Sequence, residues 1–177
     1  PIDEYTRRQS QFRAAEISAL LDTGYFIERA ERLYQYPHFI CDTGGSICEW
    51  VNAEDPADPV LSALAAHTLM VWIEGSQDHT AELIRRFDRA PKPMAYMPEF
   101  LARTWAEYRA LNNQSDAEVD PDAFIRWTYA QALAHRQPRY AAIARHWGVT
   151  VQADDVARVH SPQDFDALIA QAIAAKS

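Results

Sequence analysis

Short apolar runs without a charge alternate along the chain with longer stretches in which apolar residues recur at helical spacing. Three of the short runs, at residues 39–41, 69–73 and 149–151, have the length and composition of buried strands. Helical patterns lie before, between and after them. Because the order strand, helix, strand is typical of a parallel sheet, the sequence predicts an α/β fold, a parallel sheet with helices on both faces.

The helical stretches have recognisable start signals. Ser10 is placed to cap the first helix, and Ser161 followed by Pro162 opens the last one. The predicted helices cover residues 11–21, 25–34, 59–66, 78–87, 98–110, 121–135, 136–146 and 163–174. Residues 112–121 are the most polar stretch, which predicts a flexible tip between two helices.

Composition narrows the class of protein. The 177 residues are 48% hydrophobic, which suits one domain, 1–177, with its own core. The formal net charge of −8 disfavours binding to nucleic acid or to an anionic membrane. No apolar run approaches the length of a membrane-spanning helix, no signal peptide is visible, and there are only two cysteines. We therefore expect a cytoplasmic protein; the oligomeric state is not encoded in these features.

The first apolar run ends in Asp42 and opens into Thr43, Gly44, Gly45 and Ser46. Glycines let the backbone adopt positive φ, and successive N–H groups in such a loop can surround an anion. A tight turn without a ligand is the alternative. For Asp42, an acid at a strand end can hold Mg²⁺ through water or can cap the N–H groups of the loop, and we favour the metal-linked role.

A cluster of four cations occupies residues 85–92: Arg85, Arg86, Arg89 and Lys92. Cations at the end of a helix are favoured by the helix dipole and are commonly solvated. Arginine and lysine side chains at such a place can also bind phosphate, because the guanidinium fork matches phosphate geometry.

Several motifs resemble the shikimate kinase branch of the P-loop kinases. The first is Phe12-Arg13-x-x-Glu16, followed at a similar distance by an apolar run and Thr43-Gly44-Gly45. Later, Lys92-Pro93 looks like the cation-proline pair of the family's lid. The segment Arg136-x-Pro138-x-Tyr140, followed by Ser161-Pro162, resembles the family's closing segment. The order and spacing of the motifs cover nearly the whole chain.

The resemblance implies a three-layer α/β/α fold and an ATP-binding protein, a kinase or ATPase that uses Mg²⁺ and a small anionic or hydroxylated acceptor. The resemblance implies that the acceptor is bound by Arg13, Gly44, Gly45, Ser46 and Arg136. Arg86 and Pro162 are expected to sandwich the adenine, and Arg89 or Lys92 to stabilise charge on the transferred phosphoryl group. Phosphoryl transfer depends mainly on positioning and charge neutralisation, which such a set provides.

The chain also departs from the family. Ser46 replaces the third glycine of the loop, and residues 94–135 form a helical insertion far longer than the family's lid. No Gly-x-x-x-x-Gly-Lys-Ser/Thr occurs in the 177 residues. We therefore expect the phosphate-binding loop to precede Pro1, and this chain by itself to be catalytically incomplete.

Three hypotheses from different classes follow. The first is a P-loop kinase-like protein or ATPase whose phosphate-binding loop lies outside this chain. The second is a noncatalytic kinase-like module that binds a small anion or a protein partner. The third is an unrelated α/β interaction domain whose arginines are surface charges. A Walker A motif upstream of Pro1 would favour the first.

Overall fold

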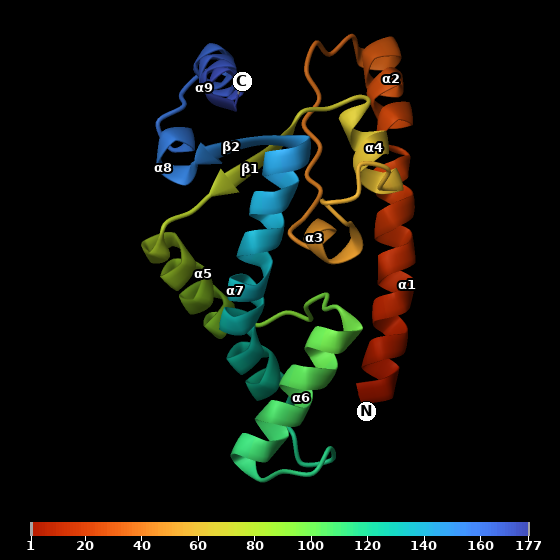
Figure 1. Ribbon diagram of the computed structural model, residues 1–177, viewed down its shortest axis with the longest axis vertical. Helices are drawn as coiled ribbons and strands as arrows, with labels where there is room; N and C mark the ends of the chain where they lie inside the picture. Colours follow the sequence, from red (N-terminus) through yellow and green to blue (C-terminus); the bar gives the residue numbers. More distant parts are fainter. Residues whose placement is uncertain (1, 177) are drawn as a thin grey trace.

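The computed structural model describes residues 2–176 and is rich in helices (Figure 1). The helices are α1 (Ile2–Leu21), α2 (Thr23–Tyr34), α3 (Ile47–Trp50), α4 (Pro59–Ala65), α5 (Gln77–Arg89), α6 (Pro98–Asn112), α7 (Pro121–Trp147), α8 (Ala153–Val156) and α9 (Pro162–Lys176). The strands are β1 (Met70–Glu74) and β2 (Gly148–Gln152). The start of the chain at Pro1, for which we expect missing upstream residues, lies outside the described residues.

The two strands form a parallel pair, with Met70 opposite Gly148 and Ile73 opposite Val151. The apolar runs at 69–73 and 149–151 are thus confirmed as neighbouring parallel strands. Helix α7 leads directly into β2, and its Tyr140 ring packs against Trp72 of β1 with 6.4 Å between ring centroids. Helix α9 packs against β2. The result is a helix-rich α/β fold built around a small parallel sheet.

The third predicted strand, at residues 39–41, is wrong. Within the described part of the chain the sheet contains only β1 and β2, and residues 39–41 are irregular chain. Ile40 is 88% exposed and Phe39 41% exposed. A strand exists only where a neighbour accepts and donates its backbone hydrogen bonds. These residues have the composition of a buried strand but no neighbouring strand to pair with.

Helix α1 begins earlier than predicted, at Ile2. Ser10 therefore lies inside the helix, where its hydroxyl donates to the Thr6 carbonyl at 3.2 Å instead of capping an N-terminus. The added turns are held from outside the helix, because the Tyr5 hydroxyl and the Gln9 amide both donate to the carbonyl oxygen of Met94. This tertiary contact extends the helix beyond the residues that the sequence pattern predicted to be helical.

Helix α7 runs without interruption through the break predicted at residue 135, and Pro138 lies inside it. A proline costs an interior helix one backbone hydrogen bond. Buried residues on either side of Pro138, such as Phe124 and Ile143, anchor both halves of the helix in packed clusters. The packing of these residues therefore outweighs the helix-breaking effect of Pro138.

The largest apolar cluster lies between α5, α6 and α7, where Phe87 stacks on Tyr129 with 3.9 Å between centroids. The polar connection from α6 to α7, predicted as a flexible tip, is hydrogen-bonded back to α6: Asp116 accepts from the Trp105 indole at 2.9 Å and pairs with Arg109 at 2.7 Å. The expected insertion at 94–135 is thus mostly a tied helical hairpin. None of the described helices is both long and apolar enough to cross a membrane.

Close approach of the two strands requires glycine at position 148. A Cβ atom placed there would lie 2.0 Å from the carbonyl oxygen of Met70. Gly148→Ala should therefore lower the free energy of unfolding by about 1–3 kcal/mol, because the added methyl group overpacks the strand pair. Urea denaturation measures this change. The matched control is Thr150→Val, an exposed position of the same strand, which should change it by less than about 0.5 kcal/mol. Equal stability of both variants would contradict the strand pairing.

Candidate functional site

The glycine loop is a short turn that delivers the chain into α3. Gly44 has a φ of 68°, in the left-handed region that favours glycine. Its N–H donates to Asp42 Oδ1 at 2.9 Å, so Asp42 caps the loop, which is the alternative to the metal-linked role. Across residues 2–176 no group of three or more His, Cys, Asp or Glu side chains is gathered in a way that suits a metal ion. Mg²⁺ binding through Asp42 remains a prediction.

Helix α3 is only four residues long, and all four side chains are buried. One of them is an acid. Glu49 Oε1 accepts from Arg136 Nε at 2.7 Å, and the two side chains are only 1% and 5% exposed. The second guanidinium nitrogen, Nη2, donates to the carbonyl oxygen of Ala95. An ion pair this deeply buried connects α3, α7 and the segment before α6.

The ion pair keeps Arg136 charged. Burial by itself would lower the pKa of the guanidinium, but the hydrogen bond and the charge of Glu49 outweigh it, so the pKa lies above its usual value. In this arrangement the guanidinium of Arg136 is buried and hydrogen-bonded to Glu49 and to the carbonyl oxygen of Ala95. Its expected contact with an acceptor stays a prediction.

The Arg13-x-x-Glu16 motif of α1 contacts the same short helix. The Trp50 indole N–H donates to Glu16 Oε2, and the guanidinium carbon of Arg13 lies 5.5 Å from the centre of the Trp50 ring. A spacing of three residues places both side chains on one face of α1. Arg13 is otherwise exposed, so its cation is held over an aromatic ring at the surface.

Gly45 is tied to α7. The Tyr140 hydroxyl donates to the Gly45 carbonyl oxygen at 2.6 Å, and the Cys48 thiol donates to the same oxygen at 3.4 Å. Arg139, the residue before Tyr140 on α7, donates through Nη1 to the Cys48 carbonyl oxygen at 3.2 Å. Burial raises the pKa of the Cys48 thiol to about 11 and also raises the pKa of Tyr140. Both groups are therefore protonated donors at neutral pH.

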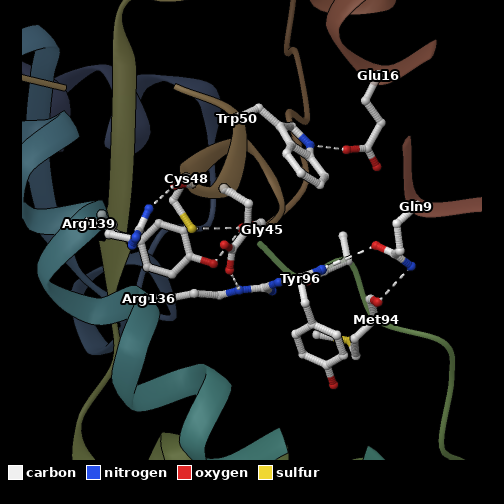
Figure 2. Close-up of polar contacts among 12 residues, drawn as sticks. Gln9, Glu16, Gly45, Cys48, Trp50, Met94, Tyr96, Arg136 and Arg139 are labelled. Carbon is white, nitrogen blue, oxygen red and sulfur yellow. Dashed lines mark hydrogen bonds and ion pairs between the residues drawn. The ribbon is translucent and has the colours of Figure 1, made fainter. Parts of the chain in front are cut away.

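Three predicted site segments thus meet at one four-residue helix. Figure 2 shows Gly45, Arg136 and Glu16 of the Arg13-x-x-Glu16 motif around Cys48 and Trp50 of this helix. Arg13 reaches it through Trp50, Arg136 through Glu49, and the glycine loop leads directly into it. The fold brings these segments together although they lie far apart in the sequence. The arrangement places the glycine loop and a surface cation beside a buried support.

The residues expected on the nucleotide side lie elsewhere. Arg86, on α5, is exposed and paired with Glu82 at 2.6 Å. Pro162 is exposed at the first turn of α9. Arg89 and Lys92 are exposed at and beyond the end of α5, and no hydrogen bond or ion pair between described residues joins either one to the glycine loop. Their expected roles toward ATP stay predictions.

Sequence reasoning missed the residues that hold the site together. Glu49, Trp50 and Tyr140 received no role, although Tyr140 was part of a recognised motif. A signal for Glu49 was present, because it is a single acid within the otherwise apolar run Ile47–Val51. A buried acid among apolar neighbours needs a cationic partner. The identity of that partner follows only from the fold.

Comparison with known proteins adds no assignment: the chain matches no protein-family model, and no curated protein or solved structure resembles it significantly. The function must therefore be argued from the geometry of the site.

Breaking the buried ion pair should be costly. Glu49→Gln or Arg136→Met each leaves one buried group without its charged partner, so each should lower the free energy of unfolding by about 3–5 kcal/mol. The double variant should lose less than the sum, with an interaction energy of about 1–3 kcal/mol. Urea denaturation of the four proteins in the cycle measures this directly.

The chain offers a matched control pair. Glu54 and Arg145 are 2.9 Å apart, but both side chains are 63% exposed. The same cycle on this pair should give at most about 1 kcal/mol, because water screens the charges. Similar interaction energies for the buried and the exposed pair would show that Glu49–Arg136 does not support the site.

The Cys48 thiol should be nearly inert in the folded protein. In a Cys41→Ser variant, Cys48 should react with a thiol reagent about a hundredfold more slowly in buffer than in urea, because only the thiolate reacts and burial suppresses it. In the Cys48→Ser variant, the remaining half-buried Cys41 should show a much smaller difference between its reaction rates in buffer and in urea.

The raised pKa of the same thiol predicts how the stability of the fold depends on pH. Because its pKa is about 11 in the folded chain against a reference of 9.0, its contribution to stability is complete below pH 9 and is lost as the pH rises towards 11. Denaturation midpoints that stay constant across that range, or equal reaction rates in buffer and urea, would contradict a buried Cys48.

Proposed function

We propose that this protein is a P-loop type phosphotransferase, a small-molecule kinase or an ATPase, whose acceptor side is built on α3. The observation that carries the proposal is the meeting of Arg13, the glycine loop and Arg136 at this helix. The motifs that resemble shikimate kinases supply those same three segments. Their proximity was not required by the sequence, and it is what a shared acceptor site needs.

The roles within this site differ from one another. Arg136, held by Glu49, acts as a positioning residue that fixes α3 and the loop carried in front of it. Arg13 is the exposed cation available to an anionic or hydroxylated acceptor. Gly45 offers its backbone N–H to the acceptor, whereas the Gly44 N–H is capped by Asp42 and would have to be released before it could bind one. Preorganised donors and cations of this kind favour phosphoryl transfer by positioning and by neutralising charge.

The finer fold belongs to the same proposal. In a three-layer P-loop arrangement, the parallel pair of β1 and β2 would be part of a wider sheet. The proposal also requires a Walker A loop outside residues 1–177, to bind Mg²⁺ and the ATP phosphates.

The test is calorimetry with Mg·ATP on the product of the complete reading frame. We expect Mg·ATP to bind, and Arg86→Gln to weaken binding about fivefold to thirtyfold, because an arginine over a base contributes about 1–2 kcal/mol. Arg13→Gln should leave nucleotide affinity nearly unchanged and should lower the rate of phosphoryl transfer.

Arg85→Gln is the matched control, because Arg85 lies on the same helix and pairs with the same Glu82 as Arg86 does. Equal effects of the Arg85 and Arg86 variants would overturn the adenine assignment. Absence of Mg·ATP binding in a protein with an intact Walker A loop would overturn the phosphotransferase proposal itself.

A second candidate, a noncatalytic interaction module, is favoured by one specific observation. Large apolar side chains are exposed from the end of α1 to the glycine loop: Leu21, Tyr25, Phe26, Leu33, Tyr34, Tyr36, Phe39 and Ile40. Exposed apolar surface on this scale is typical of contact regions between proteins. This candidate stands if nucleotide binding fails.

A further inference from the structure

A pocket of about 250 Å³ lies between α6 and α7, outside the glycine-loop site. It is lined by Met97, Glu99, Phe100, Arg103, His135 and Arg139. The apolar part of the lining is therefore a methionine and a phenylalanine, and the polar part is dominated by nitrogen donors. Pockets that combine apolar walls with a few convergent polar groups are typical ligand sites.

Phe100 organises the polar side chains of this pocket. The His135 ring lies 4.7 Å from the Phe100 ring, between centroids. The guanidinium carbon of Arg103 lies 5.2 Å from the centre of the same ring. Two nitrogen-bearing groups from different helices are thus held against one aromatic side chain, which reduces the entropy they lose on binding a ligand.

Hydrogen-bonding capacity remains in this lining. His135 Nε2 is shielded from solvent and has no hydrogen-bond partner among the described residues. Arg139 donates to the Cys48 carbonyl oxygen through Nη1, one of its five N–H donors. The acid nearest to Arg103 is Glu107, at a long 3.7 Å on the exposed side of α6. A buried polar atom without a partner is costly unless a ligand or water satisfies it.

The local charge favours an anion. Burial lowers the pKa of His135, and the cations Arg139, Arg103 and Arg136 lower it further, against an opposing effect of Glu49. His135 is thus neutral at neutral pH. With Glu99 included, the lining then carries a single net positive charge, in a protein whose formal net charge is −8. A monoanion balances this lining better than a dianion does.

We propose that the pocket between α6 and α7 binds a small organic monocarboxylate. Its carboxylate accepts hydrogen bonds from Arg103 and Arg139, and its apolar body packs against Phe100 and Met97. The His135 ring, held against Phe100, forms part of the wall beside the ligand. Arginine is suited to this role because its planar donors match a carboxylate. The inference does not depend on the proposed phosphotransferase activity.

The test uses the 177-residue chain, with benzoate as the probe, benzamide as its neutral isostere and inorganic phosphate as the alternative anion. In calorimetry, benzoate should bind at least about tenfold more tightly than benzamide and than phosphate. Arg103→Gln and Arg139→Gln should each weaken benzoate binding about tenfold. Arg29→Gln, which removes the same charge from the exposed face of α2, should leave it unchanged.

A second readout separates binding from folding, because Arg139 also supports α3. Arg103 is exposed, so its variant should keep the wild-type thermal unfolding curve. Benzoate should also raise the pKa of His135 in an NMR titration, since the new anion faces a ring otherwise surrounded by Arg103, Arg136, Arg139, Glu49 and Glu99. Equal binding of benzoate and benzamide, tighter binding of phosphate, no binding of benzoate, or an equal loss in the Arg29 variant would each overturn the proposal.

Discussion

The candidate site depends on the buried ion pair between Glu49 and Arg136. Taking two charges out of water is expensive, and the cost is offset only where geometry and additional hydrogen bonds are favourable. Here the pair is 2.7 Å apart, and the guanidinium also donates to Ala95. The interaction fixes the position of α3 relative to α7, and the other contacts of the site are made to one of these two helices or to the glycine loop that leads into α3.

Because α3 has only four residues, it has no stability of its own. Its position comes from partners in α1, in α7 and in the segment before α6, through Trp50, Glu49 and Arg136. The glycine loop inherits that position, since it leads directly into α3 and its Gly45 carbonyl is bound by Tyr140. The loop is thereby held in place on a buried base, which is what positioning of a ligand requires.

Helix α7 serves both candidate sites. Arg136 and Tyr140 contact α3 and the glycine loop, whereas His135 lines the pocket against α6. Arg139 belongs to both, because it lines that pocket and donates to the Cys48 carbonyl oxygen of α3. The uninterrupted path of α7 through Pro138 keeps these four side chains in fixed register. An anion in the pocket would therefore share Arg139 with the support of the glycine loop.

The sequence determined the elements with strong local signals: the apolar runs of β1 and β2, the short helix α4 and the helical pattern of α6. It also identified Arg13, the glycine loop and Arg136 as candidates, which the fold brings to one place. It failed at residues 39–41, where composition indicated a strand, because pairing depends on a neighbour that local sequence does not contain. The tertiary structure alone decided that Glu49 pairs with Arg136 and that α7 continues through Pro138. Both depend on contacts between distant segments: the ion pair offsets the cost of burying its two charges by direct pairing, and apolar packing on either side of Pro138 holds α7 continuous.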